Sequence, residues 1–181
     1  MVIQNYVEQH LDYISDKRLQ ITPRNRNWDK RIRLEIIQIH KYLKYLSDRG
    51  QDRWFQIAPN KDKTKHNYRV WEGKLKVTHR SDISFDIIII LSSKYPKIMP
   101  KAYIEKDVLK YSRNNNIFVN RKYPKEGTHK GKEYVQICHE HMEDNNYWTP
   151  ELTIAHFLLR EVLIWWNANI STIIKAWDHV I

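Results

Sequence analysis

The sequence predicts an α+β fold in which helices pack against an antiparallel sheet. Three observations lead to this prediction: a helical apolar stripe near the start, four strand-like segments between residues 54 and 105, and a return of helical spacing after residue 150. The 181 residues suffice for one compact domain with a short extension. We therefore expect an N-terminal helical extension over residues 1–22 and a single domain over residues 23–181.

The spacing of apolar residues predicts two helices before the strands. The first covers residues 3–19 and shows apolar residues at Ile3, Val7, Leu11 and Ile14. The second runs from about residue 28 to 47, with Asn27 as its N-cap and Gly50 as its stop. Its apolar stripe follows steps of four and three and consists of Ile32, Ile36, Ile39, Leu43 and Leu46. The opposite face is basic, which fits either a solvated surface or a partner-docking surface.

From residue 54 the periodicity becomes that of strands. The expected strands cover residues 54–58, 68–78, 83–91 and 102–105 and form an antiparallel meander. The third strand is expected to be central because one of its faces is wholly apolar and the other is partly so. That apolar face consists of Ile83, Phe85, Ile87, Ile89 and Leu91.

The segment after the fourth strand is expected to be irregular over residues 107–133, and such long loops are often functional. A helix should then begin near Pro150 with Thr149 as its cap, and a last helix should cover residues 171–179.

Composition excludes several classes of protein. The single cysteine excludes an internal disulfide framework. No apolar run approaches the roughly 20 residues that a membrane span needs, and the N-terminal residues do not resemble a secretory signal. We therefore expect a soluble, cytoplasmic protein. The net charge of +10 could attract an acidic protein partner or a phosphate backbone, and charge alone does not choose between them.

Four short motifs, in the order in which that family has them, resemble the family of ubiquitin-conjugating enzymes. They are Trp71-Glu72-Gly73 on the second strand, Phe85-Asp86-Ile87 leading to Tyr95-Pro96 and Pro100, Ile137-Cys138 at the transferring cysteine, and Trp148-Thr149-Pro150 before the next helix. The resemblance covers roughly residues 28–166 and implies the ubiquitin-conjugating fold.

The resemblance implies that Cys138 carries a ubiquitin-like protein as a thioester. The protein would receive this modifier from an activating enzyme and pass it to an amine of a target protein, without a cofactor. A thiolate is the required nucleophile, and Cys138 is the only thiol in the chain. For a lone cysteine the alternative is a small, buried apolar residue. The flanking motif favours catalysis here.

The family's His-Pro-Asn motif, whose Asn is commonly assigned to the oxyanion, is missing. His129 is the first candidate to replace it, and Asn145, Asn146 or backbone amides are alternatives. His139 and His141 could raise the thiolate fraction or accept a proton from the attacking amine.

The resemblance also implies that the helix over residues 28–47 faces the activating enzyme. Three basic residues are therefore expected to pair with an acidic surface of that partner: Lys30, Arg31 and Arg33. A metal site is not expected, because one thiol cannot supply the paired ligands of a structural zinc site. The His-Glu-His run at residues 139–141 also lacks the spacing of a metalloprotease pair.

The C-terminal segments Leu163-Ile164-Trp165-Trp166 and Ala176-Trp177 resemble divergent bacterial conjugating-like proteins. This resemblance implies a bacterial protein from an operon for antiphage defence, encoded beside an activating enzyme.

Two other classes of function compete with conjugation. A catalytically inactive binding module of the same fold would explain the missing His-Pro-Asn, although inactive variants tend to lack the cysteine. A nucleic-acid binder could use the basic and aromatic residues between 54 and 133, yet most of those aromatic residues occupy positions that packing explains. We therefore expect protein partners and no nucleic acid.

Overall fold

The computed structural model describes residues 28–60, 69–111, 117, 119–120, 128–137 and 147–179. These residues form two compact units that alternate along the chain. The first, which we name the helical unit, comprises residues 28–53, 91–100 and 147–164. The second, the sheet unit, contains the remaining described residues. The helix expected over residues 3–19 and the boundary expected at residue 22 lie outside the described residues.

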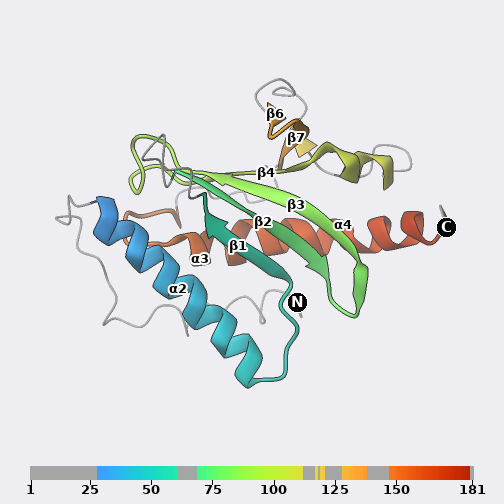
Figure 1. Ribbon diagram of the computed structural model, residues 1–181, viewed down its shortest axis with the longest axis horizontal. Coiled ribbons are helices and arrows are strands. Elements are labelled where there is room, and N and C mark those ends of the chain that lie inside the picture. The colour runs from blue at the N-terminus through green and yellow to red at the C-terminus, as the bar shows by residue number, and fades with distance from the viewer. Residues whose placement is uncertain are drawn as a thin grey trace. The chain divides into compact units, whose positions relative to one another are not determined.

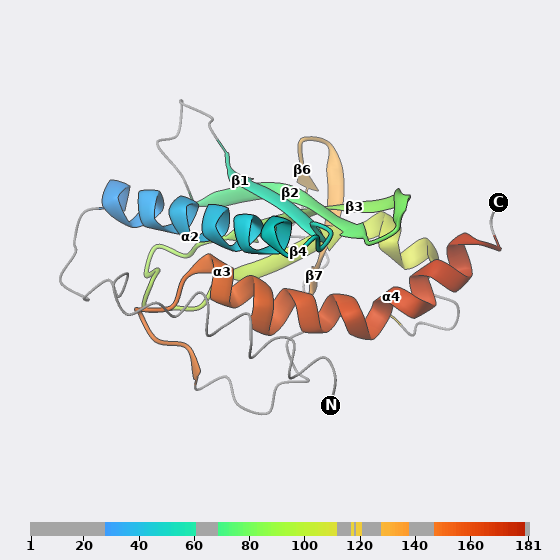
Figure 2. The same ribbon diagram turned by 90° about the horizontal axis from the view of Figure 1, so that it is seen from below.

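The helical unit begins with one long helix, α2 (Trp28–Asp48), which confirms the predicted second helix (Figures 1 and 2). Its C-terminal end is closed by two backbone hydrogen bonds, from Gly50 N to Ser47 O and from Gln51 N to Leu46 O. This is the Schellman pattern, in which the residue after the helix adopts a left-handed conformation. Gly50, with φ of 63°, supplies that conformation without steric cost.

The buried face of α2 is rotated relative to the predicted stripe. Ile36 and Leu43, both expected in the core, are only half-buried. The buried positions instead include several polar and aromatic residues: Arg31, Ile32, Glu35, Gln38, Ile39, Tyr42, Tyr45 and Leu46. The buried face is rotated because Arg31, Glu35 and Gln38 are buried, although a hydropathy pattern assigns such polar residues to the solvent-exposed face.

Arg31 and Glu35, one helical turn apart on α2, form a buried ion pair. Their exposed fractions are 4% and 0%, and Arg31 Nε donates to Glu35 Oε1 at 2.5 Å. The Tyr95 hydroxyl completes the pair, because it accepts from Arg31 Nη2 at 3.0 Å and donates to Glu35 Oε1 at 2.5 Å. Charged groups are found at this depth almost only when they are paired in this way.

The helix after the cysteine segment begins later than the sequence predicts. Pro150 lies in a turn, and α3 (Ile154–Phe157) starts four residues further on, with Thr153 as its N-cap. A π-helical turn (Leu158–Val162) follows and leads directly into α4 (Leu163–Trp177). Because α4 runs without a break through residues 167–170, the prediction of a separate last helix over residues 171–179 is wrong.

None of the helices in the described ranges is long and apolar enough to cross a membrane.

The sheet unit contains the predicted antiparallel meander and extends it. Its four strands are β1 (Phe55–Pro59), β2 (Val70–Val77), β3 (Arg80–Ile90) and β4 (Lys101–Glu105), which lie side by side in that order (Figure 1). The α+β class and the meander are therefore confirmed.

The region expected to be irregular holds further elements of the sheet unit. A 3₁₀ helix (Lys106–Tyr111) follows β4, and β7 (Lys132–Ile137) pairs with β4 in antiparallel register. Two short strands, β5 (Val119–Asn120) and β6 (Thr128–His129), both pair with β7. The prediction of an irregular segment over residues 107–133 is wrong here. Strand β7 pairs with β4, about thirty residues earlier in the chain, and a local sequence pattern does not reveal such a pairing.

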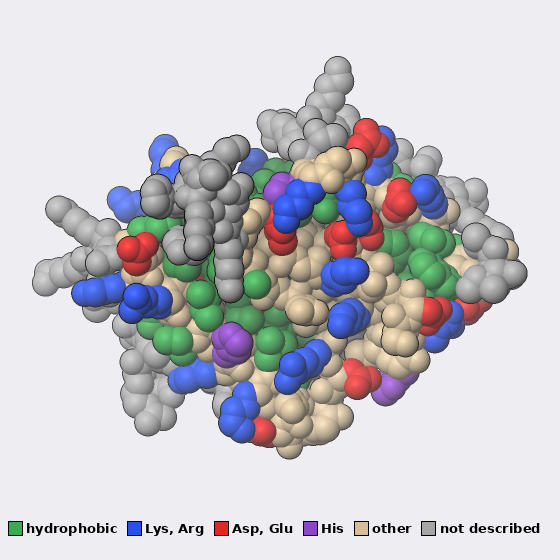
Figure 3. All heavy atoms as spheres, in the orientation of Figure 1, with side chains coloured by type: hydrophobic (Ala, Val, Ile, Leu, Met, Phe, Trp, Pro, Cys, Tyr) green, Lys and Arg blue, Asp and Glu red, His purple; other side chains and the backbone are tan. Residues whose placement is uncertain are grey.

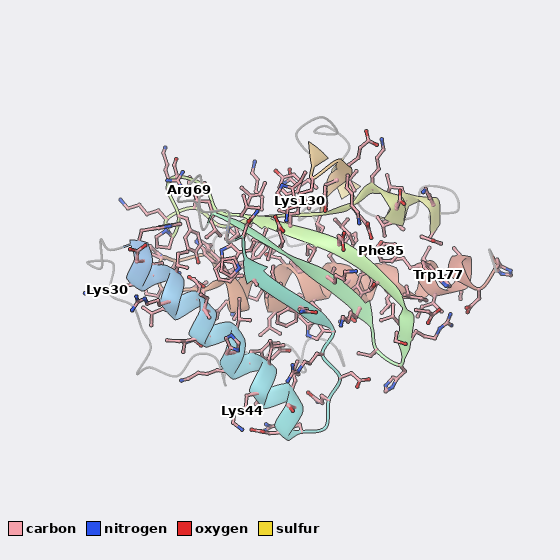
Figure 4. The ribbon with its side chains drawn as sticks, viewed as in Figure 1. Lys30, Lys44, Arg69, Phe85, Lys130 and Trp177 are labelled. Carbon is pink, nitrogen blue, oxygen red and sulfur yellow. The ribbon has the colours of Figure 1, made fainter. Side chains whose placement is uncertain are left out.

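One face of the sheet is aromatic and covered by α4. The apolar face predicted for β3 is buried as expected, with Phe85 at its centre. The Phe85 ring lies 6.2 Å from that of Trp166 and 6.3 Å from that of Trp177, both on α4. The labelled side chains of Phe85 and Trp177 can be followed in Figure 4.

The opposite face carries the hairpin of β6 and β7, which rises on the side away from α4 (Figure 2). The face holds a small buried cluster of Ile88, Tyr103 and Tyr134. Around it lie charged pairs, including Lys132 Nζ to Asp86 Oδ2 at 2.5 Å. Figure 3 shows basic and acidic side chains intermixed over these strands.

Gly73, from the Trp-x-Gly motif, is required by the close approach of β1 and β2. A Cβ atom at this position would lie 1.8 Å from the backbone oxygen of Gln56. No side chain fits that space without separating the two strands.

We expect Glu35→Gln to lower the free energy of unfolding by about 3 kcal/mol, because it leaves the Arg31 guanidinium buried without its counter-charge. The matched control is Asp48→Asn, which breaks the exposed Lys44–Asp48 pair of the same helix and the same spacing. That pair is 72% and 54% exposed, so its loss should cost less than about 0.5 kcal/mol. Urea unfolding followed by tryptophan fluorescence measures both values, and equal losses would contradict the assigned importance of the buried pair.

Candidate active site

The only cysteine directly follows an inner strand of the sheet unit. β7 lies between β4 and β5, and its last residue, Ile137, is fully buried and pairs with Val119. The backbone that leads to Cys138 is therefore fixed on both sides. Cys138 itself, together with His139, His141 and Asn145, lies outside the described residues.

Tyr147 and Trp148 are the first described residues after the cysteine, and both belong to the helical unit. Trp148 Nε1 donates to Pro96 O at 2.8 Å, and the Tyr147 hydroxyl donates to Glu161 Oε1 at 2.7 Å. Burial and the neighbouring Glu161 raise the pKa of Tyr147, so this hydroxyl keeps its proton and remains a donor. The Trp-Thr-Pro motif therefore acts as an anchor for the chain after the cysteine.

His129 lies at the tip of the β6–β7 hairpin and is engaged with Glu72 on β2. Its Nε2 forms a short contact with Glu72 Oε1, and Lys130 Nζ donates to Glu72 Oε2 at 2.5 Å. Asn60 Nδ2 also donates to Glu72 Oε1, at 2.6 Å. Burial favours a higher pKa for Glu72, but the hydrogen bonds from Lys130 and His129 outweigh it and hold the pKa below its ordinary value.

The register of the sheet separates this cluster from the end of β7. Glu72, Ile88, Tyr103 and Gln136 are successive partners across β2, β3, β4 and β7. Three strand spacings put the Cα atom of Glu72 about 14 Å from that of Gln136. His129 is therefore held toward β2, and the residue that the register places next to Ile137 belongs to β5.

The hairpin turn itself is tightly constrained. Lys130 and Gly131 have φ values of 51° and 79°, which is the pattern of a two-residue turn with both central residues left-handed. Lysine rarely adopts this conformation, and its hydrogen bond to Glu72 helps to hold it there. Figure 4 labels Lys130 at this position.

The three basic residues expected to bind a partner do not share one environment. Lys30 and Arg33 are exposed on α2 and remain candidates (Figure 4 labels Lys30). Arg31 is buried, and its hydrogen bonds to described residues are made within the helical unit, so its assignment to a partner surface is wrong. The sequence signal that could have revealed this is the opposite charge at Glu35, four residues on, beside the apolar stripe.

His156 is a buried titratable residue that sequence reasoning missed. Its Nδ1 accepts a hydrogen bond from the Thr153 backbone N–H at 3.1 Å, which requires an unprotonated Nδ1. Burial and the positive charges of Arg160 and Arg31 lower the pKa of His156 to about 4. The ring thus plays the part that Glu or Gln has in a capping box.

No group of three or more His, Cys, Asp or Glu residues that could hold a metal ion occurs in the part of the chain that the structure describes.

A helix followed by an antiparallel meander, an inner strand that ends one residue before the only cysteine, and an anchored Trp-Thr-Pro segment are features of the enzymes that conjugate ubiquitin-like proteins. A comparison with curated protein sequences gave no match. The family model of ubiquitin-fold modifier-conjugating enzyme 1, however, matches residues 7–177. The chain therefore belongs to the ubiquitin-fold modifier-conjugating enzyme 1 family.

His156 gives the protein a defined dependence on pH. Its pKa in the folded protein, about 4, lies below the ordinary value of 6.5, so the unfolded chain binds the proton more tightly. The stability that depends on the neutral ring is present above pH 6.5 and is lost as the pH falls toward 4. At 1.36 kcal/mol per pKa unit, this loss amounts to roughly 3 kcal/mol.

The variant His156→Gln keeps an acceptor for Thr153 N–H but does not titrate. Urea unfolding at several values between pH 7 and pH 4 should show a steeper loss of stability for the original protein than for the variant. If the free energy of unfolding fell equally with pH in both proteins, protonation of His156 would not be coupled to unfolding.

Proposed function

We propose that the chain accepts a ubiquitin-fold modifier as a thioester on Cys138 and passes it to an amine of a target protein. The observation that carries this proposal is the position of the only thiol, directly after the buried strand β7, in a chain whose family model spans that residue. The activating enzyme, the modifier and the target are the partners, and we propose the cytoplasm as the compartment.

Two acyl transfers make up the reaction. In the first, the Cys138 thiolate attacks the thioester carbonyl carbon of the modifier on the activating enzyme; a new C–S bond forms and the old C–S bond breaks, which releases that enzyme's thiolate. In the second, an amine attacks the same carbon; a C–N bond forms, the C–S bond to Cys138 breaks, and the amine loses a proton. The first step exchanges one thioester for another, so its main requirement is proximity.

The second step needs a group that stabilises the oxyanion and a group that accepts the proton. We propose that these groups come from the residues that follow the cysteine, with Asn145 as the oxyanion donor and His139 or His141 as the base. His129 was the first candidate from the sequence. Its contact with Glu72, and the separation of Glu72 from the end of β7, support a structural part for His129 in the hairpin.

We also propose that the exposed Lys30 and Arg33 on α2 pair with acidic residues of the activating enzyme. The C-terminal tryptophans resemble those of bacterial relatives in antiphage defence, and from them we propose a bacterial defence role. The genes that flank this one decide that point, because such operons encode an activating enzyme beside the conjugating protein.

Incubation with an activating enzyme, ATP and the ubiquitin-fold modifier should give a non-reducing gel band that is heavier by one modifier and is lost on reduction. Cys138→Ser should remove this band or convert it to an ester that resists reduction, since an ester oxygen replaces the thioester sulfur. No adduct from an activating enzyme that is itself charged would instead favour a catalytically inactive binding module.

We expect His129→Ala to leave the rate of thioester discharge to free lysine within about threefold of the original protein, because its contacts lie with Glu72. Asn145→Ala, measured beside it, should slow discharge at least tenfold, since the loss of one oxyanion donor ordinarily costs about a hundredfold to a thousandfold in rate. The reverse ranking in single-turnover discharge would return the oxyanion role to His129.

A further inference from the structure

The chain that follows the cysteine is held by the buried ion pair of α2. Arg31 Nη1 donates to Pro150 O at 2.7 Å, and Nη2 donates to Leu152 O at 2.5 Å. Glu35 Oε2 accepts from the backbone N–H of Ile154 at 2.7 Å. Two side chains one helical turn apart thus bind three backbone groups between Pro150 and the first residue of α3.

Through Tyr95, the same ion pair also holds residues 91–100, the second segment of the helical unit. The Tyr95 hydroxyl lies between Arg31 and Glu35, and its ring lies 6.2 Å from that of Trp148. Trp148 in turn donates to Pro96 O, the residue next to Tyr95. The position of Trp148 is therefore set by contacts that converge on Arg31 and Glu35.

The chemistry of the arginine side chain suits this task. A guanidinium offers several donors in a rigid plane, so Arg31 can bind Glu35, Tyr95 and two carbonyl oxygens at once. A lysine ammonium has the same charge but only three donors on one atom, one fewer than the four acceptor atoms that Arg31 contacts. Burial raises the pKa of Glu35, so its ionised form depends on these donors.

We propose that Arg31 and Glu35 are positioning residues for transfer at Cys138, because they fix the point at which the cysteine segment ends. This proposal rests on the proposed function of Cys138 as the carrier. Only nine residues separate Cys138 from Trp148. Freeing one end of so short a segment widens the range of positions that the thioester can take, and a misplacement of about 1 Å can cost up to a hundredfold in rate.

The test compares Arg31→Lys with the original protein and with Arg53→Lys, an exposed substitution of the same type in the helical unit. All measurements are made well below the unfolding midpoint of each variant, where circular dichroism shows full folding. Because Cys138 is the only thiol, its alkylation by iodoacetamide needs no partner. We expect alkylation to become at least threefold faster in Arg31→Lys and to stay unchanged in Arg53→Lys.

The second readout is discharge of the thioester over a range of lysine concentrations. We expect the maximal rate constant of Arg31→Lys to fall about tenfold, while the lysine concentration at half-maximal rate stays within twofold. If Arg31 had only a structural role, the maximal rate constant would not fall while the lysine concentration at half-maximal rate stayed the same. Tyr95→Phe, which removes only the bridging hydroxyl, should give the same pattern with a smaller change.

The outcomes are distinct. Alkylation and discharge rates of Arg31→Lys within twofold of the original would overturn the proposal and leave the pair with a role in folding alone. If the original protein forms no thioester, the proposed function fails, and the alkylation rates still report whether Arg31 controls the cysteine segment.

Discussion

The buried ion pair of Arg31 and Glu35 is the interaction on which the helical unit depends. Burying two charges has a large desolvation cost, and an apolar pair of similar volume could stabilise the fold as well as the ion pair does. An apolar pair could not, however, bind the carbonyls of Pro150 and Leu152 or the N–H of Ile154. What the ion pair supplies is therefore a unique placement of three chain segments rather than extra stability.

The sheet unit depends on a different constraint, which is the close approach of its first two strands. Gly73 lets β1 lie against β2 where any Cβ would meet the backbone of Gln56. The alternating residues of β3 then divide the sheet into an aromatic face toward α4 and a mixed face under the β6–β7 hairpin. The charges of the mixed face are paired across strands, as Lys132 and Asp86 illustrate, so the hairpin is held to the sheet close to its turn.

The predictable parts of this structure are those in which local pattern and burial agree. The alternation of Ile83, Phe85 and Ile87 identified β3 because every second residue is both apolar and buried. The face of α2 was misplaced because hydropathy assigns Arg31 and Glu35 to solvent, and only their distant backbone partners reverse that assignment. β7 was missed for a similar reason: its pairing with β4 joins segments about thirty residues apart, and no local spacing reports it.

Within the candidate site, the sequence could propose a carrier but not its supports. Cys138 is the proposed carrier because it is the only thiol and lies within a recognisable motif, whereas the contact of His129 with Glu72 depends on how the hairpin returns over the sheet. In the proposed reaction, the exchange of one thioester for another has almost no chemical driving force, so the protein would contribute mainly by placing the sulfur and its acceptor. Placement is set by groups that bind backbone atoms, and the sequence does not show which distant backbone atoms they bind. Arg31, which binds two carbonyl oxygens, is one of them, and it lies on a helix more than a hundred residues before the cysteine that we propose it positions.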